Sequence, residues 1–530
     1  MSMQPVLING SWRTPENPID TFQAVDPAKK EVLPEIYPVS SSEDVDEILA
    51  AGSEAAAQLR KLPSQKVADF LEKFADNIEG RAGELVEWAN RETALPEEPR
   101  LGTVELPRTT NQLRQAAAAT RDRSWCLATI DTGTNIRSKY GPLGGAVAVF
   151  GPNNFPFAFN SCAGGDFAAA IAAGNPVIAK ANTGHPGTTR IFAEAAFEAV
   201  EATGLPKAMV QLVYRLKPAE GFKLVSHPQI GATGFTGSKW AGIRLKEAAD
   251  KAGKPIYLEM SSVNPVFVLP GVLRERSAEV AAELFGSCSL GAGQFCTNPG
   301  LVVVQAGPES ETFINQVAEL FAANAPGTLL GKNGPRDIAD AIGVLTKHGA
   351  EVVTGGEVAA GPGYAFKNTV LRTSGDAFID NPDALQTEAF GTVALIVFAK
   401  DVAQMQAVAA SMEGNLTGGL YSHSGGDDDD IYNQVEPVLR QKVGRLLNDK
   451  MPTGVAVVPS MNHGGPYPAT GHPGFTAVGI PASMLRFGAL HCYDNVRAHR
   501  LPAELRDKNP TGSVWRFVDG TWTQGDVGVK

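Results

Sequence analysis

Cys296 has the side chain best suited to nucleophilic chemistry in this sequence. It lies within GAGQFCTNPG, residues 291–300, where glycine and proline allow backbone N–H groups to converge on its sulfur. A free thiol has a pKa of about 8.5, so a reactive cysteine needs nearby dipoles or a base to form its thiolate. The alternative is that Cys296 is simply a small buried apolar residue, as many cysteines are.

Glu259 ends an apolar run in LEMSSVNP, residues 258–265, and offers a carboxylate at the carboxyl end of an expected strand. Ligand sites of doubly wound sheets lie at such strand ends. Burial would raise the pKa of this carboxyl and suit it to general base catalysis. A purely structural role as a hydrogen bond acceptor stays open.

Two further turns follow expected strands. In GPNNFP, residues 151–156, the amide of Asn154 either donates to a developing oxyanion or closes a turn of its own backbone. In TGSKWAG, residues 236–242, Ser238 is the expected helix N-cap, and Gly237 and Gly242 would allow a pyrophosphate to approach the helix N-terminus. Alone, this glycine motif is weak.

The elements that must position these residues follow a β/α alternation. Apolar residues at helical spacing, from Val45 to Ile78, predict helices early in the chain, the first opened by a capping box from Ser40 to Glu43. Five short apolar runs, each followed by a helical stretch, then predict a parallel, Rossmann-like sheet. These strands are expected at residues 146–150, 176–179, 210–214, 230–235 and 255–259.

A second α/β series follows without an obvious linker, so the boundary near residue 260 is soft. Its strands are expected at residues 265–269, 301–305, 352–354, 393–398 and 454–458. Alternating residues near Thr134–Tyr140 predict exposed strands instead. The run Asp427–Asp430 is expected at the positive N-terminus of a helix rather than at a calcium site.

Composition limits the possible partners. The formal charge of −11 and pI near 5.4 disfavour nucleic acid binding. The first twelve residues lack a signal-peptide pattern, and no stretch of eighteen apolar residues occurs, so we expect a soluble, cytoplasmic protein that binds no membrane. Five widely spaced cysteines argue against a disulfide framework or a thiolate metal cage, and no metal is expected.

Taken in chain order, these motifs resemble the aldehyde dehydrogenase superfamily. GPNNFP is followed by a strand ending at Lys180, then by FTGS, LEMSSVNP, GQFCTNPG and finally TEAFGTV with Glu388 and Phe390. The resemblance implies an α/β fold with a Rossmann-like cofactor domain, a second α/β catalytic domain and a β-strand oligomerisation arm. The implied ranges are 1–127 with 146–260, then 261–482, and 128–145 with 483–530.

The resemblance also implies the reaction. Cys296 would attack the aldehyde as nucleophile, Asn154 with the Cys296 N–H would form the oxyanion hole, and Glu259 would activate water to hydrolyse the thioester. In the cofactor site, Lys180 resembles the ribose-binding lysine. The diphosphate turn corresponds to Ser238 with Gly237 and Gly242, and the pair that holds the nicotinamide ribose to Glu388 with Phe390.

The cofactor preference depends on a departure from the common pattern. NAD-preferring members typically carry a glutamate three residues after the ribose lysine, where this sequence has Thr183. Threonine can donate to a 2′-phosphate that a glutamate would repel, and Arg215 could add positive charge. We therefore expect NADP in preference to NAD, or use of both.

The C-terminal motifs narrow the resemblance to one branch. NHGGPYP, residues 462–468, replaces the usual GGxKxSG and resembles the 2,5-dioxopentanoate (α-ketoglutarate semialdehyde) dehydrogenases, whose product is 2-oxoglutarate. Met260, Ser261 and Ser262 also depart from the usual LGGK. Four residues match positions that line the aldehyde tunnel, although packing roles are open for each: Phe159, Phe295, Thr297 and His463.

Several readings remain open beside this one. They are a broad-specificity NADP-dependent dehydrogenase of aliphatic aldehydes, a CoA-acylating semialdehyde dehydrogenase, and a binding protein without turnover. Retention of Glu259 counts against thioester transfer to CoA. The exposed strands near Thr134–Tyr140 and the segment after Ser483 resemble the arm through which family members pair, so a homodimer or homotetramer is expected.

Overall fold

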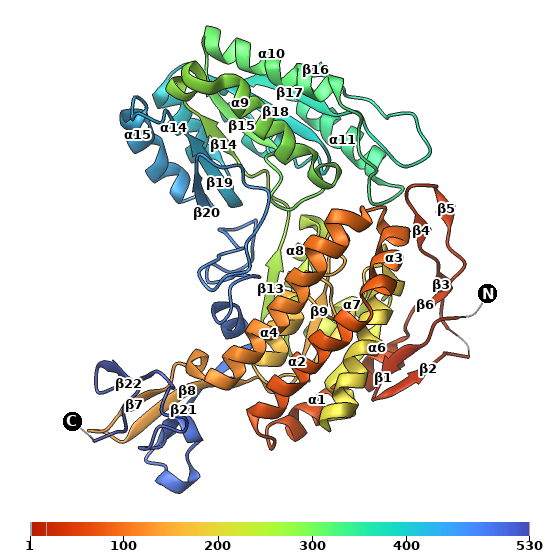
Figure 1. Ribbon diagram of the computed structural model, residues 1–530, viewed down its shortest axis with the longest axis vertical. Helices are drawn as coiled ribbons and strands as arrows, with labels where there is room; N and C mark the ends of the chain where they lie inside the picture. The colour runs from red at the N-terminus through yellow and green to blue at the C-terminus, as the bar shows by residue number, and fades with distance from the viewer. Residues whose placement is uncertain (1–2, 17, 529–530) are drawn as a thin grey trace.

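Three β-sheets organise the chain. The computed structural model describes residues 3–16 and 18–528, so the outermost ends of the predicted ranges, 1–2 and 529–530, lie outside the described residues. Two seven-stranded sheets, each with helices packed against it, lie one above the other in Figure 1, and a five-stranded sheet projects to one side. The α/β class expected from the sequence is confirmed.

The first sheet contains the predicted Rossmann-like strands. Its order is β13-β12-β9-β10-β11-β1-β2, and the first five strands are mutually parallel. The glycine- and proline-bounded apolar runs thus form adjacent buried strands, as predicted. The strands are β1 (Val6–Ile8), β2 (Ser11–Arg13), β9 (Ala146–Phe150), β10 (Val177–Lys180), β11 (Val210–Val213), β12 (Ile230–Thr236) and β13 (Ile256–Glu259).

The helices up to residue 251 pack against this sheet, because the apolar residues of each helix lie on one side of it. In α2, Val67, Phe70, Leu71, Phe74 and Ile78 are all buried. A π-helical segment, Glu97–Glu105, leads into α4. The helices are α1 (Ser42–Leu59), α2 (Ser64–Gly80), α3 (Ala82–Thr93), α4 (Leu106–Asp122), α5 (Gly165–Ala172), α6 (Pro186–Thr203), α7 (Pro218–Ser226) and α8 (Lys239–Lys251).

The capping box of α1 lies one residue later than predicted. Ser41 has an extended backbone, accepts a hydrogen bond from the Asp44 N–H and donates its own N–H to the Asp44 carboxylate. Ser40 is buried, and its N–H donates to the Arg215 carbonyl instead. The prediction of Ser40 with Glu43 was therefore wrong, because tertiary pairing occupies Ser40.

The second sheet has the order β16-β17-β18-β15-β14-β19-β20. Four of its five predicted strands are confirmed, near residues 265–269, 301–305, 352–354 and 393–398, and three strands were missed. The strands are β14 (Val266–Val268), β15 (Leu301–Gln305), β16 (Glu351–Thr354), β17 (Thr369–Ser374), β18 (Val393–Ala399), β19 (Asn415–Tyr421) and β20 (Val443–Asn448). Of these, β17, β19 and β20 were not predicted.

The strand predicted at residues 454–458 was wrong. This run is irregular, and Val455 and Val457 pack against an aromatic cluster that includes Phe159. Side chains satisfy its carbonyl groups: Arg445 donates to Gly454, and Gln115 donates to Val457. A partly exposed apolar run can thus pack against a cluster without joining a sheet, which periodicity alone cannot distinguish.

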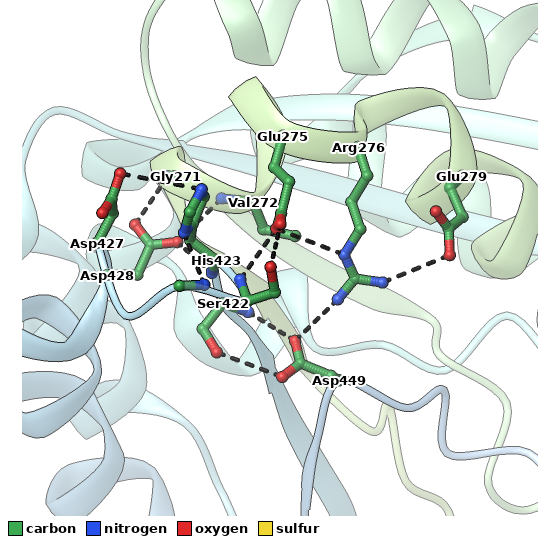
Figure 2. A network of polar contacts seen from close by, with 12 residues as sticks. Gly271, Val272, Glu275, Arg276, Glu279, Ser422, His423, Asp427, Asp428 and Asp449 are labelled. Atoms are coloured by element: carbon green, nitrogen blue, oxygen red, sulfur yellow. Dashed lines mark hydrogen bonds and ion pairs between the residues drawn. The ribbon is translucent and has the colours of Figure 1, made fainter.

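Helices follow the strands of the second unit, and the aspartate run contacts the N-terminal ends of two of these helices. Asp428 accepts hydrogen bonds from the N–H groups of Gly271 and Val272, at 2.7 and 2.9 Å, at the N-terminus of α9 (Figure 2). The run thus serves the start of α9 as well as of α15. The helices are α9 (Pro270–Ser289), α10 (Pro308–Ala323), α11 (Gly334–Lys347), α12 (Gly375–Asp380), α13 (Pro382–Leu385), α14 (Val402–Ser411) and α15 (Asp429–Arg440).

The five-stranded sheet joins segments far apart in the sequence. Its order is β21-β8-β7-β22-β23, and it extends away from both larger units (Figure 1). The predicted exposed strand falls within β8, which pairs with β21 in antiparallel register. The strands are β7 (Thr129–Asp131), β8 (Ile136–Pro142), β21 (Gly488–Asp494), β22 (Arg516–Val518) and β23 (Thr521–Thr523).

Two short hairpins lie near the N-terminus, formed by β3 (Thr21–Phe22) with β6 (Tyr37–Pro38) and β4 (Val25–Asp26) with β5 (Glu31–Val32). Within residues 3–16 and 18–528, no helix is long and apolar enough to cross a membrane.

Candidate active site

The turn that carries Cys296 has a demanding backbone. Gly291, Ala292 and Gly293 all have positive φ, between 57° and 74°. At Gly293 a Cβ atom would lie 2.1 Å from the carbonyl carbon of Gly391, so only glycine fits this approach. The glycine-rich sequence therefore brings the cysteine turn against TEAFGTV, the motif of Glu388 and Phe390.

Asn264 holds the cysteine turn in place through its side chain, for which the sequence predicted no role. Its side-chain amide donates to the carbonyl groups of Cys296 and Asn298, at 2.8 and 2.9 Å. Its own φ is +48°, a conformation that asparagine tolerates better than most residues. The signal that could have found it is the NP step of LEMSSVNP, which the family shares.

The thiol, an imidazole and a carboxylate meet at the centre of the site. Cys296 Sγ lies 3.4 Å from His463 Nε2, which lies 2.8 Å from Glu259 Oε1. His463 and Glu259 are each about 1% exposed. The sequence placed His463 on a tunnel wall, whereas the structure places its ring between the expected nucleophile and the expected base.

Cys296, His463 and Glu259 lie close enough together to share a proton or to bind a metal ion. Their ligating atoms lie within 4.8 Å of one another, the only such set of His, Cys, Asp and Glu among the described residues. Glu259 Oε2 is buried and has no hydrogen bond partner in the described part of the chain. That oxygen is therefore free to accept a proton from an incoming molecule.

The surroundings of Cys296 favour its neutral thiol in the empty site. Burial raises the pKa of the thiol well above its usual value, and the negative charge of Glu259 adds to this effect. The positive charge of Arg108 acts in the opposite direction and lowers the pKa of the thiol. Cys296 therefore stays protonated until a ligand changes these charges or a base accepts its proton.

Asn154 is tied to the cysteine turn. Its side-chain Nδ2 donates to the Gln294 carbonyl at 2.9 Å, rather than closing a turn of its own backbone. An amide nitrogen carries two hydrogens, so one N–H remains for a second acceptor. Because Asn154 and Cys296 both line the same cavity, this donor is positioned beside the thiol.

A cavity of about 890 Å³ opens next to Cys296, a size that suits a dinucleotide or its reactive half. Most of the predicted site residues line it. They are Thr183, Arg215, Gly237, Ser238, Glu388 and Phe390, together with Cys296, Glu259 and Asn154. Lys180 and Gly242 do not: Lys180 lies behind the wall, and Gly242 packs against Met260 within α8.

Positive charge gathers at one end of this cavity. Arg215 is exposed and has no ion pair among the described residues, and the exposed Thr183 lines the same cavity. Burial and the nearby Arg215 together lower the pKa of Lys180 to about 8. Two cations without local counter-ions favour an anionic group there.

Two further residues of the expected cofactor site lie at the cavity wall. Ser238 is the N-cap of α8, as predicted, and its hydroxyl accepts from the Ala241 N–H at 3.4 Å. The Glu388 carboxylate accepts from the Ser262 N–H, and burial raises its pKa to about 7.

The other side of Cys296 is aromatic. The ring centroids of Phe155 and Phe295 are 5.0 Å apart, those of Phe155 and Phe159 are 5.4 Å apart, and Phe159 lies 5.6 Å from the His463 ring. Thr297 is buried directly after the cysteine. The predicted tunnel residues Phe159, Phe295 and His463 thus form one contiguous wall, and the sequence missed two arginines, Arg100 and Arg108, that lie against it.

A thiol beside a histidine and a buried carboxylate, next to a dinucleotide-sized cavity, fits an oxidoreductase of the aldehyde-oxidising type. The chain belongs to the aldehyde dehydrogenase family, whose sequence pattern it matches over residues 12–439. It is an NAD(P)-dependent aldehyde dehydrogenase, and the family resemblance and fold predicted from the sequence are confirmed.

Relatives with known names resemble it over nearly their whole length. Alpha-ketoglutaric semialdehyde dehydrogenase 2 of Azospirillum brasilense is 37% identical over 518 residues, covering 94% of this chain and 96% of its own. Alpha-ketoglutaric semialdehyde dehydrogenase of Acinetobacter baylyi is 33% identical, covering 98% of both. The solved structure of an aldehyde dehydrogenase from Bacillus cereus has a TM-score of 0.78 at 22% identity, covering 93% of this chain and 96% of its own.

Proposed function

We propose that this enzyme oxidises 2,5-dioxopentanoate, the semialdehyde of α-ketoglutarate, to 2-oxoglutarate, with NADP favoured over NAD. The observation that carries the substrate assignment is the similarity, over nearly the full chain, to two enzymes named for that semialdehyde. NHGGPYP supports it, because this motif places His463 against both Cys296 and Glu259.

The first chemical step belongs to Cys296. Its thiolate, formed when the thiol proton leaves to solvent, attacks the aldehyde carbon and forms a thiohemiacetal. The free N–H of Asn154 and the Cys296 N–H stabilise the oxyanion. Glu388 and Phe390 would hold the ribose of a nicotinamide, which would supply the hydride acceptor that converts the thiohemiacetal on Cys296 into a thioester.

Glu259 then acts as general base. Its unpartnered Oε2 accepts a proton from water, which attacks the thioester and releases the carboxylate product. His463 holds Oε1 through its Nε2, so the carboxylate keeps one oxygen fixed and one free. This division of the two oxygens leaves Oε2 available to activate water.

The residues at the cavity fit a dinucleotide phosphate. Arg215 and Thr183 would hold the 2′-phosphate, and Lys180 would hold the adenosine ribose. The diphosphate would bind at the N-terminus of α8, at Ser238 with Gly237 and Gly242. Glu388 and Phe390 would hold the nicotinamide ribose. The lack of an acidic residue at position 183 supports NADP, since it removes a source of repulsion.

The domain division and the assembly are part of the proposal. Residues 1–127 with 146–260 would bind the cofactor, 261–482 would carry the nucleophile, and 128–145 with 483–530 would form the oligomerisation arm of a homodimer or homotetramer. The arm has an open strand edge at β21, and Leu490 and Trp522 on its surface are at least half exposed.

A comparison of substrates tests the function. We expect kcat/KM for 2,5-dioxopentanoate to exceed that for succinate semialdehyde, and to exceed that for hexanal by at least about 100-fold. The reaction should proceed without CoA and release free 2-oxoglutarate. An equal or higher kcat/KM for hexanal would point to a broad-specificity aliphatic enzyme, and a requirement for CoA would overturn the hydrolytic mechanism.

A further inference from the structure

Arg108, in the first turn of α4, is a half-buried cation that has no ion pair among the described residues. Its Nε and Nη2 atoms are inaccessible to solvent, and neither has a hydrogen bond partner among the described residues. No carboxylate of those residues forms an ion pair with it, although ion pairs are frequent on α4. A desolvated guanidinium in this state is costly to the fold unless an anion binds to it.

The neighbouring Arg100 differs, because both of its Nη atoms have partners and only its Nε is buried without one. Its Nη1 pairs with Glu105 at 2.7 Å, and its Nη2 donates to the Asn154 carbonyl at 2.9 Å. The other oxygen of Glu105 accepts the N–H groups of Phe157 and Ala158. Glu105 is thus fully occupied and leaves Arg108 without a counter-ion.

Arg108 lies against the aromatic wall of the reaction centre. Its guanidinium carbon is 5.3 Å from the ring centre of Phe159 and 5.6 Å from that of Phe155. The other neighbour of Phe159 is His463, which contacts Cys296. Phe159 therefore contacts both the Arg108 guanidinium and the imidazole that lies beside the thiol.

The unpartnered atoms of Arg108 have the geometry of a carboxylate receptor. Nε and Nη2 form one edge of the guanidinium, and two parallel N–H bonds from such an edge match the two oxygens of a carboxylate. Arg445, a second cation near Cys296, differs: its Nη1 and Nη2 donate to the carbonyls of Gly454 and Pro452, so only Nε lacks a partner.

We propose that Arg108 binds the carboxylate of the aldehyde substrate through Nε and Nη2, and so selects aldehydes that carry an acidic group at the far end. In 2,5-dioxopentanoate the aldehyde carbon and the carboxylate carbon are about 5 Å apart when the chain is extended, and Arg108 is near enough to Cys296 for their charges to interact. This inference rests on the proposed function and names the residue behind its substrate class.

The primary test measures substrate discrimination. In the full-length enzyme with NADP, Arg108→Gln should lower the ratio of kcat/KM for 2,5-dioxopentanoate to kcat/KM for pentanal by on the order of 100-fold. The change should arise mainly in KM for the charged aldehyde. Arg108→Lys, which keeps the charge but not the paired N–H edge, should give an intermediate ratio.

A matched control exists on the same helix. Arg114 lies on the exposed side of α4 and pairs with Glu79 and Asp76. Arg114→Gln should leave the ratio within about twofold of the wild type. If Arg108→Gln lowers both kcat/KM values equally, or leaves the ratio unchanged, Arg108 does not bind the carboxylate. If Arg108→Gln does not fold, as judged by its melting curve, the ratio of Arg108→Lys decides.

A second readout separates this inference from the proposed substrate. Glutarate, a five-carbon dicarboxylate, should protect Cys296 of the wild type from iodoacetamide, and this protection should be lost in Arg108→Gln. If 2,5-dioxopentanoate proves a poor substrate but the protection depends on Arg108, the proposed function fails and the carboxylate site stands. Equal protection in both proteins would overturn the site.

Discussion

The two sides of Cys296 are built differently. On one side, an open cavity of about 890 Å³ is lined by small, polar, charged and apolar residues, many of them at the ends of parallel strands. On the substrate side, Phe155, Phe159 and Phe295 form a packed wall around one unpaired cation, Arg108. The thiol lies where the two regions meet.

The two regions recognise their ligands by different means. A nucleotide is recognised largely through phosphates and ribose, so strand ends and helix N-termini, which any sequence of this fold provides, suffice. A small aldehyde offers few atoms, so selectivity depends on one charged side chain in an apolar wall. Substitutions on the two sides should therefore affect cofactor and aldehyde kinetics separately.

The largest effect is expected where the two sides meet. Cys296→Ala should reduce NADP turnover by at least about 10⁴-fold, because no other group can form the thioester. NADP affinity, measured by fluorescence titration, should change less than about twofold, since Cys296 forms only a small part of the cavity wall. Cys492→Ala, at the exposed thiol of β21, is the control and should retain full turnover. Turnover by Cys296→Ala above a few per cent would refute the nucleophile assignment.

The next effect separates the two chemical steps. Glu259→Gln should release one equivalent of NADPH per active site in a burst and then slow to a rate about 10²- to 10⁴-fold lower, because hydrolysis lacks its base. Stopped-flow absorbance measures both phases. A mutant that loses the burst and the steady rate together would show that Glu259 is essential before hydrolysis.

The same variant makes a pH prediction with a definite sign. The negative charge of Glu259 raises the pKa of the Cys296 thiol, so its removal should lower that pKa. The pH at half-maximal iodoacetamide alkylation should therefore fall in Glu259→Gln relative to the wild type. A rise would mean that Glu259 favours the thiolate in the empty enzyme.

A smaller effect tests the cofactor side alone. Arg215→Gln should lower kcat/KM for NADP by about 10- to 100-fold, the loss of a charged hydrogen bond, and leave NAD within about twofold. Lys217→Gln is the matched control, because Lys217 is also exposed but does not line the cavity. A tenfold preference of the wild type for NAD would contradict the role of Thr183 and Arg215.

The smallest effect is a pH dependence of cofactor affinity. Lys180 has a pKa of about 8 in the empty site, so it is charged below pH 8 and neutral above it. An anionic ligand stabilises the charged form, so the Kd for NADP should stay constant below pH 8 and rise by up to about tenfold per pH unit above it. Lys180→Met should flatten this profile; an identical profile in both proteins would exclude Lys180 from the interaction.

The cofactor side was readable from the sequence because its motifs are local. Some predicted residues lie at a strand end, as Lys180 does in β10, or open a helix, as Ser238 does in α8, so short-range patterns predict where they lie. The apolar runs predicted the parallel strands for the same reason. Errors arose where tertiary contacts replaced local ones, as at Ser40 and in residues 454–458.

Cys296 and its turn were thus determined by the sequence itself, together with the family, the Rossmann-like sheet and the cofactor motifs. Only the tertiary structure decided that His463 bridges the thiol and Glu259, that Asn264 holds the turn, and that Arg108 lacks a counter-ion. The contacts of His463 join residues as far apart as 259 and 463. Their energies depend on burial and on which partners are absent, and no local pattern of residues records either property.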